Sequence, residues 1–136
     1  MKLLIMDSEA CKIDIEKDEW SKLINIAQTK KIEIEEQKMA QVIVVLTSNE
    51  KIYSYLFDYG NRLVLEEEKH FLGIIKNDAD TSVKKMVCLW SDGSVDFPSY
   101  SLREKMIQTN LQNESTEILL NGYGGFIVKT IGKTMK

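Results

Sequence analysis

The feature that most constrains this chain is an unbroken apolar run, Val-Ile-Val-Val-Leu, at residues 42–46. β-Branched residues favour strands, and a strand without polar alternation is typical of one buried on both faces. A chain of 136 residues with 43% apolar residues has enough material for one core of this kind, without a disulfide or a structural metal. We therefore predict a single domain over residues 1–136, built around this strand.

Helical and alternating patterns lie on both sides of the run. Trp20, Leu23, Ile24 and Ala27 recur at helical spacing, so residues 18–30 are expected to form a helix with Asp18 as its N-cap. Ser101 and Glu104 form a capping box that predicts a second helix, which would bury Leu102, Met106 and Leu111. Alternation predicts strands at 11–16, 32–35, 63–65, 85–90 and 95–97, and a hairpin with arms at 117–120 and 126–131.

Residues 52–59 fit two patterns. As a strand, they place Tyr53, Tyr55, Phe57 and Tyr59 on one face; as a helix, they form a stripe that begins after a capping box at 47–50. The aromatic content favours the strand, with its rings packed beneath the helix at 18–30. A short helix over 66–76 follows, although Gly73 weakens that prediction.

The order hairpin, helix, hairpin in the second half of the chain indicates the fold class. It predicts an α+β domain with a mostly antiparallel β-sheet and two or three helices packed on it.

Charge and cysteine content exclude several functions. The net charge is −3, and residues 1–68 carry 9 basic and 14 acidic side chains (net −5), so nucleic-acid binding is not expected. Cys11 and Cys88 have no Cys or His at metal-ligand spacing, so we expect no metal and no cofactor. The apolar stretch at the N-terminus is too short for a secretory signal, and no apolar segment approaches the length that is needed to span a bilayer. A cytoplasmic protein without a membrane partner is expected.

Catalytic motifs are absent from the local sequence. His70 is the only histidine, and it sits beside an acidic run. Gly132-Lys133-Thr134 lacks the first glycine and the following helix of a phosphate-binding loop, and residues 122–125 lack the helix of a dinucleotide fingerprint. We therefore assign no catalytic residue from the sequence.

The main functional interpretation is a small non-enzymatic protein-interaction domain that covers a basic site on another protein. Bacterial or phage-encoded inhibitors, including toxin-immunity proteins, share this size and charge, although no residue motif carries the likeness. The expected partner-binding residues are acidic or aromatic: Glu66, Glu67, Glu68, Tyr53, Tyr55, Tyr59, Trp90, Tyr100 and Tyr123.

Two alternatives remain. One is a small enzyme or ligand-binding domain, whose pocket would include His70, Asp96 or Arg103, with Cys88 as a further polar member. The other is a homo-oligomer formed through an exposed edge strand at 32–36, which the alternating glutamates disfavour.

Overall fold

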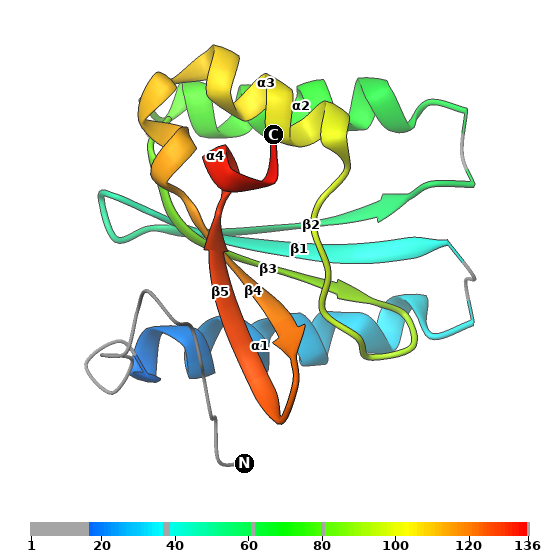
Figure 1. Cartoon of the computed structure of the whole chain (residues 1–136). Helices are drawn as coiled ribbons and strands as arrows, with labels where there is room; N and C mark the ends of the chain where they lie inside the picture. The colour runs from blue at the N-terminus through cyan, green and yellow to red at the C-terminus, as the bar shows by residue number, and fades with distance from the viewer. Residues whose placement is uncertain (1–16, 37–38, 61, 80, 136) are drawn as a thin grey trace.

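The computed structural model describes residues 17–36, 39–60, 62–79 and 81–135. A five-stranded sheet in the order β2-β1-β3-β4-β5 lies between helices (Figure 1). The elements, in chain order, are α1 (Lys17–Lys31), η2 (Ile32–Ile34), β1 (Ala40–Thr47), β2 (Ile52–Asp58), α2 (Val64–Asn77), β3 (Val83–Trp90), α3 (Tyr100–Thr109), η3 (Leu111–Ser115), β4 (Glu117–Gly122), β5 (Gly125–Thr130) and α4 (Ile131–Thr134). The predicted single α+β domain is confirmed.

β1 is the strand around which the sheet forms. All eight of its residues are buried, as the apolar run predicts, and it pairs antiparallel with β2 on one side and β3 on the other. Val42 and Val44 pack with Trp20 and Leu23 of α1, whereas Ile43 packs on the opposite side. Figure 1 shows α1 beneath the sheet and α2 and α3 above it. The β-branched run is continuous because both of its faces meet helices.

The β4–β5 hairpin joins this unit by a parallel pairing of β3 with β4, in which Lys85 faces Glu117 and Met86 faces Ile118. Buried polar side chains reinforce that junction. The Asn113 Oδ1 atom accepts a hydrogen bond from the Val83 amide at 2.8 Å, and the Thr116 hydroxyl donates to the Val83 carbonyl at 2.6 Å. Side chains therefore replace part of the backbone ladder where β4 begins.

The expected strand at 32–35 is wrong. Residues Ile32–Ile34 form a 3₁₀ turn that continues from α1, and the backbone remains helical at Lys31 and Glu35. Ile34 is 2% exposed and Ile32 is 68% exposed, so the alternation reflects one inward side chain on a helical turn. Because these residues form no strand, the edge that would support strand-mediated self-association does not exist there.

The strand alternative for residues 52–58 is confirmed as β2. Its rings, however, do not lie beneath α1. Tyr53, Tyr55, Phe57 and Tyr59 belong to the core cluster that contains Phe71 and Ile75 of α2, whereas Ile52 and Leu56 pack on the α1 side. The aromatic row therefore fills the layer between the sheet and α2.

Three further boundaries differ from expectation. Leu63 is the N-cap of α2, so residues 63–65 begin a helix and form no strand. The N-cap of α3 is Ser99, whose hydroxyl accepts from the Leu102 amide at 3.0 Å; the predicted box at Ser101 lies inside the helix. The strand expected at 95–97 is not formed, and this segment makes only an isolated antiparallel bridge between Val95 and Leu89.

Other predictions hold or fall outside the described residues. The helix at 18–30, the helix at 66–76 and the strand at 85–90 are present with slightly wider bounds, although Asp18, the expected N-cap, lies inside α1. The C-terminal hairpin is present with arms at Glu117–Gly122 and Gly125–Thr130, and Ile131 belongs to α4. Leu111 lies beyond α3 and is exposed, whereas Leu102 and Met106 are buried as expected. The strand expected at 11–16 lies outside the described residues. None of the helices in the described part of the chain has the length and apolar character that a membrane crossing requires.

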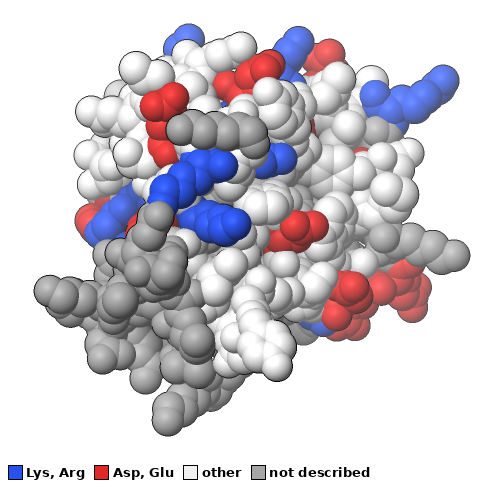
Figure 2. Space-filling view, viewed as in Figure 1, with Lys and Arg blue, Asp and Glu red and all other residues white. Residues whose placement is uncertain are grey.

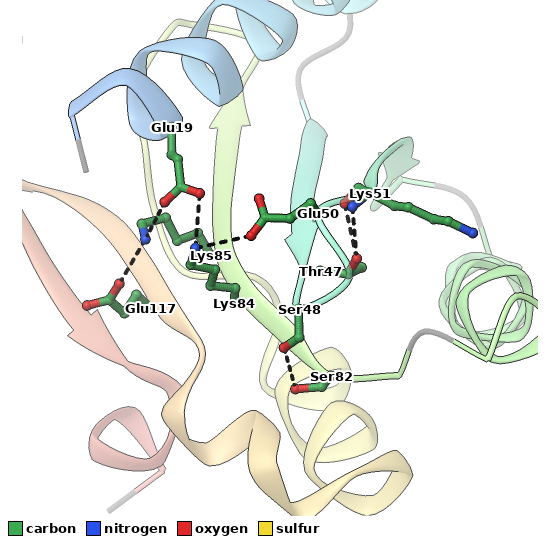
Figure 3. Close-up of polar contacts among 9 residues, drawn as sticks. All are labelled: Glu19, Thr47, Ser48, Glu50, Lys51, Ser82, Lys84, Lys85 and Glu117. Carbon is green, nitrogen blue, oxygen red and sulfur yellow. Dashed lines mark hydrogen bonds and ion pairs between the residues drawn. The ribbon is translucent and has the colours of Figure 1, made fainter. Parts of the chain in front are cut away.

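An ion-pair network ties the start of α1 to the sheet (Figure 3). Glu19 accepts from the ammonium groups of Lys84 and Lys85, each at 3.0 Å, and Lys85 also lies 3.6 Å from Glu117. Lys85 is fully buried. A buried ammonium group requires such partners, because an unpaired charge in the interior is strongly unfavourable.

Replacement of Phe57 by alanine tests the aromatic layer. Phe57 is fully buried and its ring contacts those of Tyr55 and Phe71. We expect Phe57→Ala to lower the free energy of unfolding by about 3–5 kcal/mol in urea denaturation. Tyr123→Ala, at a fully exposed side chain on the hairpin tip, is the control and should change it by less than about 0.5 kcal/mol. Equal effects of the two variants would contradict the assigned packing.

The Glu19 network predicts a specific acid response. Burial raises the pKa of Glu19, but hydrogen bonds from Lys85 and Lys84 outweigh it, so the net pKa lies below the ordinary value. A depressed folded-state pKa contributes stability that is present above the unfolded pKa, about 4.3, and is lost as pH falls through the folded value. Glu19→Gln should therefore lose less stability than the wild type between about pH 5 and pH 2. Glu104→Gln, at an exposed α3 residue, is the control; superimposable acid profiles for Glu19→Gln and wild type would refute the role of the pair.

Candidate functional site

A buried carboxylate lies where α2 and α3 meet. Glu68 of α2 is 1% exposed. Its Oε2 atom accepts from the Ser99 hydroxyl at 2.5 Å, and its Oε1 atom accepts from the Lys105 ammonium at 3.0 Å. The Lys105 ammonium also donates to the Ser101 hydroxyl at 2.8 Å. We call Glu68, Ser99, Ser101 and Lys105 the Glu68 cluster.

Sheet topology brings these residues together. β2 and β3 both run antiparallel to β1, so they run in the same direction and end at the same edge of the sheet. The chain passes from the end of β2 into α2 and from the end of β3 into α3, so both helices begin at this edge (Figure 1). The Ser99 hydroxyl, as N-cap of α3, is thereby positioned to donate to the α2 carboxylate.

A cavity of about 330 Å³ opens at the same edge and is lined by Met39, Trp90, Ser91 and Asp92. We call it the Trp90 pocket. The Trp90 indole nitrogen donates to the Asp96 carboxylate at 3.0 Å, and the indole ring lies 5.6 Å from the Tyr59 ring. The indole is therefore held in place by both a polar and an aromatic contact.

Tyr59 and Gln41 lie between the Trp90 pocket and the Glu68 cluster. The Tyr59 hydroxyl donates to Gln41 Oε1 at 3.2 Å, and the fully buried Gln41 amide donates to the Phe97 carbonyl at 3.1 Å. Burial raises the pKa of Tyr59 above its ordinary value, and the nearby Cys88 and Glu68 raise it further, while hydrogen bonding with Ser99 partly opposes the change. The Tyr59 phenol is therefore a neutral hydrogen-bonding group at physiological pH.

The structure brings together some of the residues expected to line a ligand pocket. Burial raises the pKa of the Cys88 thiol, and the Asp96 carboxylate raises it further. Burial lowers the pKa of Arg103, whose guanidinium stacks over the rings of Phe97 and Tyr100 at 5.0 and 5.6 Å. His70 lies apart from them, exposed on α2, with its ring 6.2 Å from that of Tyr55.

The structure places the residues expected to bind a protein partner on several different elements. Glu66 is exposed, but Glu68 is buried beneath α3, so an accessible acidic patch of three glutamates does not exist. Tyr53, Tyr55 and Tyr59 are partly covered by α2, Trp90 lines its pocket, and Tyr100 and Tyr123 are exposed on separate elements.

On the face drawn in Figure 2, basic side chains gather left of centre and acidic ones lie beside them and toward the edges.

Sequence reasoning missed Ser99, Lys105 and Gln41. A serine directly after the single proline, Pro98, and three residues before the buried Leu102 is an N-cap signal that competes with Ser101. Lys105 follows Ser101 by one helical turn, which places the two side chains together. Gln41 is a polar residue in an otherwise mostly apolar strand, and its hydrogen-bond partners, Tyr59 and Phe97, lie far from it in the sequence.

Comparison with solved structures finds this fold in cytidine deaminases. The enzyme from Mycobacterium leprae matches with a TM-score of 0.64 and 12% identity, over 85% of this chain and 96% of that chain. The enzyme from Mycobacterium tuberculosis matches with a TM-score of 0.61 and 14% identity, over 85% of this chain and 92% of that chain. No protein-family model and no curated protein matches the sequence.

These matches correct the main functional interpretation. The proteins that share the architecture are named as enzymes, and no comparison supports an inhibitor or a toxin-immunity protein. The alternative of a small enzyme or ligand-binding domain agrees better with the fold.

The metal associated with this fold does not fit the residues present. Zinc-dependent nucleobase deaminases carry an H-x-E…P-C-x-x-C signature, in which His or Cys and two further Cys hold the ion. Here the proline is followed by Ser99 and Leu102 at the two cysteine positions. Among the described residues, no group of three or more His, Cys, Asp or Glu could hold a metal ion. No zinc-dependent step can be derived for this chain.

The Lys105–Glu68 pair makes a testable contribution to stability. Lys105→Met leaves the Glu68 carboxylate buried without its cation, so we expect a loss of about 3 kcal/mol in the free energy of unfolding. Glu68→Gln combined with Lys105→Met should lose clearly less than the sum of the two single changes, because the amide carries no charge. Urea denaturation of the four proteins completes the double-mutant cycle. Lys129→Met, at an exposed residue of β5, is the control; additive losses would show that the pair is not coupled.

Proposed function

We propose that this chain is a small ligand-binding domain with a cytidine deaminase-like fold, which binds a planar polar molecule of the nucleobase or nucleoside class in the Trp90 pocket. The observation that carries the proposal is the placement of the Trp90 indole. It lines a cavity at the edge of the sheet where α2 and α3 begin, and it is held there by Asp96 and Tyr59.

The dimensions and lining of the pocket support this class of ligand. A volume of about 330 Å³ is within the range of small-molecule sites. An indole face stacks on a heterocycle. The Ser91 hydroxyl and the Asp92 Oδ2 atom can supply polar contacts for the edge of the heterocycle, while Asp92 Oδ1 accepts hydrogen bonds from Ser94. The solved structures with this fold are named cytidine deaminases, which makes cytidine the first ligand to test.

The chemistry of the Glu68 cluster favours binding over hydrolysis. Hydrolytic deamination by the zinc enzymes needs a metal-activated water and a glutamate that transfers protons. In the part of the chain that the structure describes, no group of three or more His, Cys, Asp or Glu side chains could hold a metal ion, and both carboxylate oxygens of Glu68 are hydrogen-bonded, one to Ser99 and one to Lys105. We therefore expect the ligand to leave unchanged.

Tryptophan fluorescence tests the proposal directly, because the chain has two tryptophans in different places. Trp20 is buried on the α1 side, and Trp90 lines the pocket. Titration with cytidine should quench the wild type and Trp20→Phe but leave Trp90→Phe unchanged. Calorimetry should show that Trp90→Ala weakens binding roughly 5- to 150-fold, since a stacked base contributes about 1–3 kcal/mol.

Two results would contradict the proposal. One is the absence of both fluorescence change and heat with cytidine, uridine, adenosine and guanosine at millimolar concentration. The other is release of ammonia from cytidine by the wild type in proportion to enzyme concentration, which would show turnover in place of binding alone.

A further inference from the structure

We infer that the Lys105 ammonium supplies the fixed positive charge that a metal ion supplies in the zinc enzymes of this fold, and that the site is metal-independent. This inference rests on the fold likeness and goes beyond the proposed function, because it concerns how the Glu68 cluster is held together without zinc.

The correspondence with the zinc signature is set by structure as well as by sequence. Pro98 is the single proline of the chain, and α3 begins two residues later with Ser99 as its N-cap. Of the three consecutive glutamates in the first turns of α2, Glu68 is the one that contacts Ser99. Counting along the signature from Glu68 and from Pro98 assigns Glu66 to the histidine position, Glu68 to the glutamate position, and Ser99 and Leu102 to the two cysteine positions.

The three ligand positions cannot hold zinc as they stand. Leu102 is fully buried in the core cluster with Met106 and has no donor atom. Ser99 offers a hydroxyl, which is outside the usual set of Cys, His and carboxylate ligands of zinc, and that hydroxyl already contacts Glu68 and the Leu102 amide. Glu66 would then be the only one of the three positions with a usual zinc ligand, and one carboxylate is fewer than the three protein ligands that a catalytic zinc site has.

Lys105 takes up the electrostatic role. It approaches Glu68 from the second turn of α3, and its ammonium group is shared between Glu68 Oε1 at 3.0 Å and the Ser101 hydroxyl at 2.8 Å. The Lys105 side chain is 21% exposed and that of Glu68 is 1% exposed, so the pair is largely shielded from water. A buried carboxylate requires a cation and hydrogen bonds, and here α3 provides both. A divalent ion added beside Lys105 would meet a like charge.

The test restores the missing ligands and then removes the lysine. One variant carries Glu66→His, Ser99→Cys and Leu102→Cys, and a second carries the same changes with Lys105→Met. Zinc per chain is measured by elemental analysis, and cobalt binding by its thiolate absorption. We expect no zinc in the wild type purified from zinc-supplemented medium, and one zinc in the second variant. The first variant, which keeps Lys105, should bind zinc at least tenfold more weakly than the second.

A matched control moves one cysteine. The control variant carries Glu66→His, Leu102→Cys and Lys105→Met, as the second variant does, but has Ser101→Cys instead of Ser99→Cys. This change moves one thiol two residues along the chain, and it should abolish the cobalt–thiolate absorption. Stoichiometric zinc in the wild type would overturn the inference. Equal zinc affinity with and without Lys105 would overturn the role assigned to the lysine.

The wild type and single substitutions of Lys105 keep the inference testable if the variants with several substitutions do not fold. The melting temperature of the wild type should be the same with zinc and with a chelator, and a rise with zinc would overturn the inference. Lys105→Arg should recover at least half of the melting temperature lost in Lys105→Met, because it restores the cation, and no recovery would count against the inference. None of these measurements uses a nucleoside, so their outcome is separate from that of the proposed function.

Discussion

Every residue of β1 is buried, and this constraint decides the arrangement of the other elements. A strand with two apolar faces must be covered on both, so α1 packs on one side and α2 and α3 on the other. The strand must also be paired along both edges, since its backbone groups have no access to water. β2 and β3 provide that pairing, and both run antiparallel to it.

The same arrangement creates the site. Two strands that run in one direction end at one edge, and the helices that follow them start there side by side. Helix starts are places where side-chain caps are needed, and the cap of α3, Ser99, also bonds the carboxylate of Glu68. The cap that α3 requires therefore also connects α3 to α2, through the Ser99 hydroxyl. From the sequence alone, this hydroxyl would be assigned only to the capping of α3.

Local patterns predicted most of the elements, because periodicity reports on which side chains face a core. Trp20 and Ala27 at helical spacing identify α1, and the Gly124 turn, with its φ of 83°, lies where the C-terminal hairpin was expected. Residues 32–35 were misassigned because one buried isoleucine in a helical turn gives the same short pattern as a strand. The site was less predictable. Glu68 has the same neighbours in sequence as a solvated glutamate, and its burial depends on Lys105, 37 residues away.

The junction between β3 and β4 has a consequence for the kinetics of amide hydrogen exchange. The hairpin of β4 and β5 is attached to the central strands through its first residues and through Asn113 and Thr116. β1, in contrast, pairs with β2 and β3 along most of its length, with one register shift toward β3 between Leu46 and Thr47. Cooperative units of native proteins often coincide with such supersecondary motifs. We therefore expect the hairpin and the three-stranded unit to differ in opening free energy, and the Val83 amide, which donates to the Asn113 side chain, to report on the boundary between them.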